Sequence, residues 1–298
     1  MDTGLAYYKP SGVAPPSGVI LTTLAGCVLA VAAGALYGII SYTIPLIFLH
    51  CLNFVFAGEL GFLLGFAVSK GVSAFHVRNV SCAVICGIIV FACAYVSHWF
   101  FYLAAYGITK LSGAPEIFGT AYLLFENPRE AWKRIQFING DGWPLTNFSD
   151  SGEIMIRGWT LWTIWTAEAI WIGYLTLAAP VRQANAPYSE RRGIWMDAVD
   201  LPKHIAFIEN VSDFKKSFSG GDYGALMTPF DVWRAPLDPR DEKYAVVTMY
   251  PDSWDPYISV SNVTVKHGKK KRRVSAENVV KYLKLPAEIS LEIKDALS

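Results

Sequence analysis

Charged residues are scarce in this sequence. Of its 298 residues, 17% are charged and 53% are hydrophobic, whereas a typical soluble domain carries about 25% charged residues. This composition excludes a protein that is soluble throughout. Positive charge is also in little excess, with a net charge of +1, so the chain lacks the overall field that attracts nucleic acid. Nucleic acid is therefore not expected as a partner.

Cysteines are few and are confined to the apolar part of the chain. All five lie within long apolar stretches, at Cys27, Cys51, Cys82, Cys86 and Cys93. The polar regions have no cysteine to pair, which excludes a secreted domain stabilised by disulfides and indicates a reducing compartment. The last three would share one face of a helix, where packing against a neighbouring helix is favoured over a metal or redox role.

Recognised catalytic signatures are missing. The sequence contains no GxSxG, no HExxH, no P-loop and no pair of CxxC motifs, which are the usual marks of serine hydrolases, zinc proteases, nucleotide hydrolases and zinc or redox sites. We therefore expect a protein that is not an enzyme and that binds no cofactor.

Long apolar stretches are what the sequence does have. Four of them reach the length needed to cross ~30 Å of hydrocarbon as a helix; they cover residues 19–41, 45–68, 80–108 and 157–179. The predicted fold class is a membrane all-α four-helix bundle followed by a small soluble α+β domain. The expected regions are a flexible N-terminal segment (1–18), the transmembrane domain (19–179) with an extracytoplasmic loop (109–156), and a cytoplasmic domain (180–298).

Small residues recur at four-residue steps in the first two spans. They are Gly26, Ala30, Gly34 and Gly38 in the first span and Ala57, Gly61 and Gly65 in the second. Such faces allow helix backbones to approach closely in lipid. Because the two spans are joined by a very short link, we expect these faces to meet in a tight antiparallel hairpin.

The loop before the last span contains NPREAWKRIQFIN (127–139), in which apolar and basic residues alternate at helical spacing. It predicts a short helix, either lying at the membrane surface or capping the loops. Basic residues in the short 69–79 link and directly after the last span indicate that this side is cytoplasmic. We therefore expect a protein of the bacterial inner membrane with both termini in the cytoplasm.

Two acidic residues fall near the middle of predicted spans, Glu59 in FVFAGELGFLLGF and Glu168 in LWTIWTAEAIW. An ionised carboxylate in hydrocarbon costs about 2.5 kcal/mol or more, so each should face protein or water. One interpretation is a proton or cation relay that uses both. We favour a polar contact within the chain or with a partner subunit, because the sequence shows no internal repeat and four spans are few for a transporter.

His50 and His98 would lie in the outer half of the membrane on neighbouring spans. Two histidines so placed are able to ligate a haem inside a helix bundle. A histidine within a span is more often hydrogen-bonded to its neighbours, so the haem site is the weaker hypothesis.

The chain becomes more polar after residue 180. Helical spacing predicts a helix over 203–218, and residues rich in β-branched and aromatic types predict strands at 243–250 and 257–265. ENVVKYLKL (277–285) and PAEISLEIKDAL (286–297) are predicted to form two short helices.

A basic cluster lies in the predicted turn after the second strand, at Lys269, Lys270, Lys271, Arg272 and Arg273. These side chains would contact anionic lipid or an acidic partner. The simpler interpretation is a solvated turn.

The chain resembles polytopic bacterial membrane proteins of unassigned function. The resemblance depends on an N-terminal Pro-Ser-Gly, on Arg78-Asn79 before the third span and on a tryptophan-rich fourth span with Glu168 inside it. It covers the membrane part better than the C-terminal part, and it implies topology without implying an activity.

Together these features predict a non-catalytic membrane subunit or adaptor that anchors a cytoplasmic domain to a membrane complex. Expected partners are lipids and other membrane or cytoplasmic subunits, with a homo-oligomer as a further option. The alternative is an ion or proton channel or transporter component that uses Glu59 and Glu168. A haem-binding redox subunit that uses His50 and His98 is a minor alternative.

Overall fold

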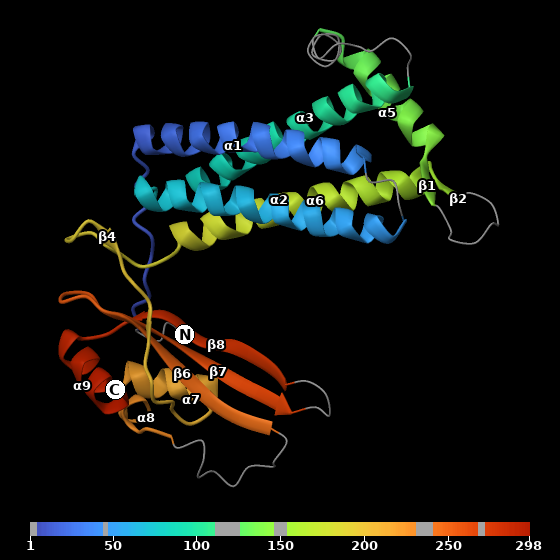
Figure 1. Cartoon of the computed structure of the whole chain (residues 1–298). Coiled ribbons are helices and arrows are strands. Elements are labelled where there is room, and N and C mark those ends of the chain that lie inside the picture. Colours follow the sequence, from blue (N-terminus) through green and yellow to red (C-terminus); the bar gives the residue numbers. More distant parts are fainter. Residues whose placement is uncertain (1–4, 44–46, 111–125, 146–153, 231–240, 268–271) are drawn as a thin grey trace. The chain divides into compact units, whose positions relative to one another are not determined.

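A computed structural model describes residues 5–43, 47–110, 126–145, 154–230, 241–267 and 272–298 (Figure 1). The chain divides into two compact units. One is Ser11–Asn185; the other combines the described part of the N-terminal segment, residues 5–10, with Ala186–Ser298. Each unit has a hydrophobic core of its own.

Four long helices form the first unit: α1 (Pro16–Thr43), α2 (Ile47–Ala74), α3 (Val80–Lys110) and α6 (Trp159–Ala184) (Figure 1). Each is long and apolar enough to cross a membrane. Four apolar helices followed by a small sheet-containing region agree with the prediction at this level. All four helices continue past the predicted C-terminal ends, because helical hydrogen bonding continues into polar residues once a span has nucleated, whereas α2 and α6 begin two residues after the predicted starts.

The glycine faces pack closely, but against other helices than expected. A Cβ on Gly34 of α1 would lie 2.3 Å from the carbonyl oxygen of Ala94 in α3. A Cβ on Gly65 of α2 would lie 2.4 Å from the carbonyl oxygen of Leu175 in α6. The expected pairing of the two faces with each other is therefore wrong. The small residues instead let the backbone of α1 approach that of α3, and the backbone of α2 approach that of α6.

The other small residues follow the same pattern. Gly38 lies against the backbone of His98, Gly61 lies against the backbone of Ile172, and Gly26 faces Val90 of α3. Ala30 and Ala57 are fully buried in the same core. Helices α1 and α2 contact each other near the start of α1 and the end of α2, where Gly71 lies against the side chain of Thr22.

Helix α5 (Pro128–Asp141) and the hairpin of β1 (Trp143–Leu145) with β2 (Ile154–Ile156) precede α6. The helix predicted for 127–139 is therefore present. It packs on an aromatic cluster at the ends of α3 and α6, where the rings of Trp132 and Trp162 lie 5.3 Å apart. Trp143 Nε1 donates a hydrogen bond of 3.1 Å to the Tyr102 hydroxyl. These contacts favour the capping role.

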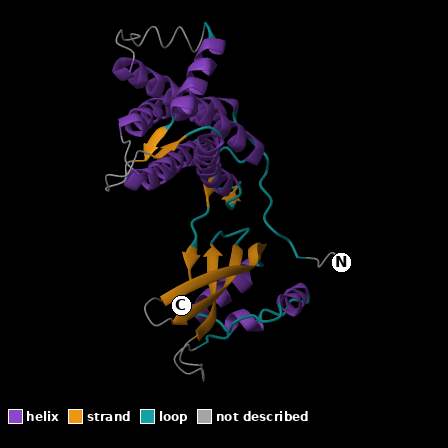
Figure 2. Ribbon diagram, turned by 90° about the vertical axis from the view of Figure 1, so that its right-hand side faces the viewer, coloured by secondary structure: helices purple, strands orange, loops and turns teal. Residues whose placement is uncertain are grey.

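The second unit contains an antiparallel sheet with helices packed on one face (Figure 2). The sheet order is β5 (Val199–Asp200), β6 (Asp241–Tyr250), β7 (Tyr257–His267) and β8 (Arg272–Lys284). The helices are α7 (Val211–Ser219), α8 (Gly224–Met227) and α9 (Ala287–Leu297), and a small hairpin joins β3 (Tyr188–Ser189) to β4 (Ile194–Trp195). The apolar side chains of Phe214, Leu226 and Ile293 cover the sheet.

Two helix predictions in this unit need correction. ENVVKYLKL belongs to strand β8, because pairing with β7 and burial of Val279 and Val280 outweigh its helix-forming residues. The helix predicted over 203–218 begins only at Val211. The two strands predicted at 243–250 and 257–265 are present as β6 and β7, and the second helix of the final pair is α9.

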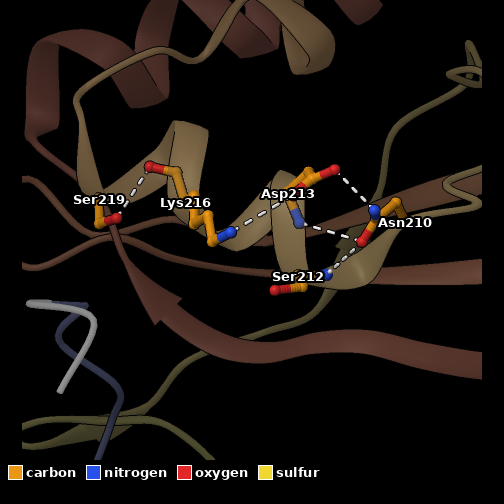
Figure 3. Close-up of polar contacts among 5 residues, drawn as sticks. All are labelled: Asn210, Ser212, Asp213, Lys216 and Ser219. Carbon is orange, nitrogen blue, oxygen red and sulfur yellow. Dashed lines mark hydrogen bonds and ion pairs between the residues drawn. The ribbon is translucent and has the colours of Figure 1, made fainter. Parts of the chain in front are cut away.

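Helix α7 begins at Val211 because Asn210 caps it (Figure 3). Asn210 Oδ1 accepts hydrogen bonds from the backbone N–H groups of Ser212 (3.1 Å) and Asp213 (3.2 Å). Asn210 Nδ2 donates to Asp213 Oδ2 at 2.6 Å. The residues before this cap instead join the sheet, where Ile205 bridges to Ala245.

The N-terminal segment is not the free lead-in that its composition predicts. Its Tyr8 N–H donates to the Tyr282 carbonyl at 2.8 Å, and the Lys284 N–H donates to the Ala6 carbonyl at 2.8 Å. Residues 5–10 therefore extend the β8 edge of the sheet.

Candidate functional sites in the membrane unit

Glu59 lies in the middle of α2 and on its outer surface. It is 12 residues from Ile47, or about 18 Å along the axis at 1.5 Å per residue. Its side chain is exposed, and so are its helical neighbours Val55 and Phe62. Within the described residues it has no hydrogen bond or ion pair. In a bilayer, an ionised carboxylate so placed costs about 2.5 kcal/mol or more unless something covers it.

A groove of about 820 Å³ runs beside this residue between α2 and α6. Small residues, Gly58 and Ala167, lie among larger aromatic and aliphatic side chains. Its lining is Phe54, Val55, Gly58, Ala167, Ile170, Trp171 and Tyr174. A Cβ on Gly58 would lie 3.0 Å from Trp171 Nε1, so the glycine lets the two helices hold the indole between them.

Glu168 lies inside the bundle, so the two acidic residues do not share a site. Its exposed fraction is 7%, and its carboxyl faces the Tyr37 hydroxyl of α1. Neither Tyr37 Oη nor Glu168 Oε1 makes a hydrogen bond of ordinary geometry within the described residues. The rings of Tyr95 and Tyr102 from α3 lie within electrostatic range of the same carboxyl.

Several polar side chains near Glu168 are buried. Asn53 of α2 is 1% exposed and Ser41 of α1 is 8% exposed. Among described residues, neither the Asn53 amide atoms nor Ser41 Oγ have a hydrogen-bond partner. Buried polar groups are normally satisfied by protein, water or ligand. Counted over the described residues, this part of the bundle therefore has hydrogen-bonding capacity that its side chains leave unused.

His98 borders this region, and the haem hypothesis is not tested. Its imidazole is 9% exposed, and its ring centroid lies 4.8 Å from that of Tyr37 and 5.4 Å from that of Trp99. The side chain of His50 lies outside the described residues, so the pair stays a prediction. Within the described part of the chain, no group of three or more His, Cys, Asp or Glu residues is arranged to hold a metal ion.

The basic cluster of the second unit is described only in part. Lys269, Lys270 and Lys271 lie outside the described residues. Arg272 begins β8, and Arg273 is exposed and pairs in register with Lys266 of β7. The prediction that Arg272 and Arg273 lie in the turn is therefore wrong, because ladder pairing with β7 places both in β8. Contact of the basic cluster with lipid or an acidic partner stays a prediction.

The buried polar residues of the bundle are not evident from hydropathy. Tyr37 lies near the end of the first predicted span, yet its side chain is 5% exposed and faces the bundle interior. Asn53 was not singled out, although it lies one helical turn before Ala57 on the packed face of α2. That four-residue spacing from a small residue was the available signal.

Comparison with known proteins adds nothing to the description of these sites. No protein-family model, curated protein or solved structure matches this chain. The contacts of Glu59 and Glu168 are accordingly the basis for the proposals that follow.

Proposed function

We propose that this protein is a non-catalytic subunit of a membrane complex, which anchors a sheet-containing domain to the bilayer. The observation that carries the proposal is the pairing of residues 5–10 with β8. The domain is connected to the membrane unit at both its chain ends, before α1 and after α6. Two connections restrict the movement of the domain more than a single linker would. A domain that is held in this way loses less freedom when a soluble partner binds to it.

The charges near the helix ends favour a cytoplasmic domain. Lys70 lies four residues before the end of α2 and Arg182 lies in the last turn of α6, at the end of the bundle where α1 begins. Arg78 lies in the short link between α2 and α3. Positive residues next to spans favour the cytoplasmic side. Both termini would then be cytoplasmic, in a bacterial inner membrane.

A second candidate function is proton or cation binding at Glu168, as part of a channel or transporter. The buried polar atoms around Glu168 without hydrogen-bond partners among described residues favour it. The outward position of Glu59 counts against a relay that uses both carboxylates, because Glu59 is exposed on the surface of the bundle whereas Glu168 is buried inside it.

One experiment separates the two functions. The full chain is purified in a gentle detergent, and its companions are identified and quantified by mass spectrometry. A companion present in a fixed ratio, and lost when Tyr8→Pro breaks the pairing with β8, supports the subunit. The matched control is Lys9→Ala, because Lys9 is exposed. A chain that purifies alone and moves protons in liposomes, with Glu168→Gln abolishing transport, contradicts it.

A further inference from the structure

We propose that the groove between α2 and α6 holds one transmembrane helix of a different protein, and that this helix carries a lysine or arginine at the depth of Glu59. The inference rests on the proposed function as a subunit and adds the chemistry of the partner within the membrane.

The shape of the groove fits a helix. It is open along its length, and Gly58 and Ala167 lie between the larger side chains of Phe54, Trp171 and Tyr174. Small residues flanked by larger ones let a second backbone approach closely, which is how helices associate in lipid. The exposed aromatic rings provide contact area on both helices, since Phe54 of α2 is 40% exposed and Trp171 and Tyr174 of α6 are 43% and 62% exposed.

The Glu59 carboxylate determines which kind of molecule is expected to fill the groove. Glu59 is not itself a lining residue, but it follows Gly58 in sequence and is one turn after Val55, and both of these residues line the groove. A lipid chain in the groove would leave this side chain without a partner in hydrocarbon. A cationic side chain on a neighbouring helix supplies both opposite charge and hydrogen-bond donors, which is how intramembrane acids are normally paired.

A second copy of this chain does not supply that charge. Within α1, α2, α3 and α6 the lysines and arginines are Lys70, Lys110 and Arg182; Lys110 is the last residue of α3, Arg182 lies in the last turn of α6, and Lys70 lies four residues before the end of α2. Lys70 is 11 residues from Glu59, or about 16 Å along the axis. In a copy with the same orientation, each cation lies near a membrane surface while Glu59 lies near the middle. The missing charge must therefore come from another protein.

Site-specific photo-crosslinking in the native membrane tests this arrangement. A photoreactive amino acid replaces Phe62, which is 68% exposed and lies one turn after Glu59. The control position is Val28, which is 75% exposed and near the middle of α1. We expect a cross-link from position 62 to a transmembrane segment of another polypeptide, with a basic residue within one turn of the attachment. Adding Glu59→Gln should lower the yield about ten-fold or more, while the yield at position 28 stays unchanged.

A defined probe tests the charge without the natural partner. The purified full chain is reconstituted in liposomes with a synthetic transmembrane helix of leucine and alanine that carries one central lysine, and association is followed by fluorescence energy transfer. We expect this peptide to bind about ten-fold more tightly than the same peptide with a central leucine. The preference should disappear in Glu59→Gln, whose exposed position leaves the bundle packing intact.

Several results would overturn the inference. They are equal binding of the two peptides, cross-links from position 62 to this same chain or to lipid alone, and a cross-linked segment without a basic residue. Failure of the proposed function looks different. A stable companion without any cross-link at the groove contradicts the inference and leaves the subunit role intact, whereas a cross-linked helix without a companion for the sheet-containing unit contradicts the anchoring role.

Discussion

Replacing Gly34 by alanine should weaken the contact between α1 and α3. The new Cβ would lie 2.3 Å from the Ala94 carbonyl oxygen and 3.1 Å from both the Ala94 carbonyl carbon and Cα. All three atoms belong to the backbone of α3, so no side-chain rotation relieves the overlap. An ordinary contact begins near 3.4 Å. The two helices must therefore separate by about 1 Å at this level.

The cost follows from that separation. A gap of about 0.5–1 Å forfeits a quarter to a half of the attraction between neighbouring atoms, and overpacking a close-fitted site costs roughly 1–3 kcal/mol. Alanine also returns about 1 kcal/mol, because it favours the helix more than glycine does. We expect Gly34→Ala to lower the free energy of unfolding by roughly 1–2 kcal/mol, and Gly34→Leu to lower it further.

Gly173→Ala is the matched control. Gly173 is also in the middle of a spanning helix, but its new Cβ would lie 3.7 Å from the nearest atom, on the ring of Phe91. That substitution should be neutral or stabilising. Thermal unfolding in detergent can be followed with a dye that fluoresces on reaction with thiols, because Cys86 is buried in the bundle. If Gly34→Ala unfolds at or above the temperature of both the wild type and Gly173→Ala, the close α1–α3 contact is refuted.

Three other variants test the interior, the sheet edge and the surface. Glu168→Ala should lower the unfolding temperature of the membrane unit, by an amount that corresponds to about 2 kcal/mol, and Glu168→Gln should lower it less because it keeps polar atoms at that site. Tyr8→Pro removes a backbone donor at the β8 edge, costs about 1 kcal/mol, and should increase hydrogen exchange at the Lys284 amide. Burial raises the pKa of Asp252, but hydrogen bonds from Ser189 and two backbone N–H groups outweigh it and hold that pKa below its usual value. A carboxyl with a lowered pKa stabilises the fold above its unfolded pKa, so wild type and Asp252→Asn should differ in urea unfolding at pH 7 and converge as the pH falls below about 4.

The spanning helices could be predicted from sequence because their signal is local. A run of about 20 apolar residues is sufficient, and each predicted span overlaps one long helix. Strands β6 and β7 could also be predicted from sequence, since both are rich in β-branched and aromatic residues. Strand β8 was not, because its glutamate, lysines and leucines favour a helix and only the ladder with β7 makes it extended. That information lies in the partner strand.

The prediction of a flexible N-terminal segment was wrong for a similar reason. Proline, glycine and serine exclude a helix before Pro16, and the prediction of a flexible segment followed from that. The chain nevertheless pairs with β8 through Tyr8 and Lys284. An edge strand offers free backbone groups to any extended segment within reach. Composition excludes a helix here, but it does not show whether an edge is available.

The spacing of small residues on α2 also predicts which of its polar side chains point into the bundle and which point outward. Ala57, Gly61 and Gly65 mark the packed face, and successive residues on a helix are about 100° apart. Glu59 is two residues from Ala57 and from Gly61, so it must point away from that face, whereas Asn53 is one turn from Ala57 and must point inward. Hydropathy cannot distinguish the two, because a spanning helix is apolar on all sides. The small residues therefore assign Asn53 to the interior and leave Glu59 for something outside this chain.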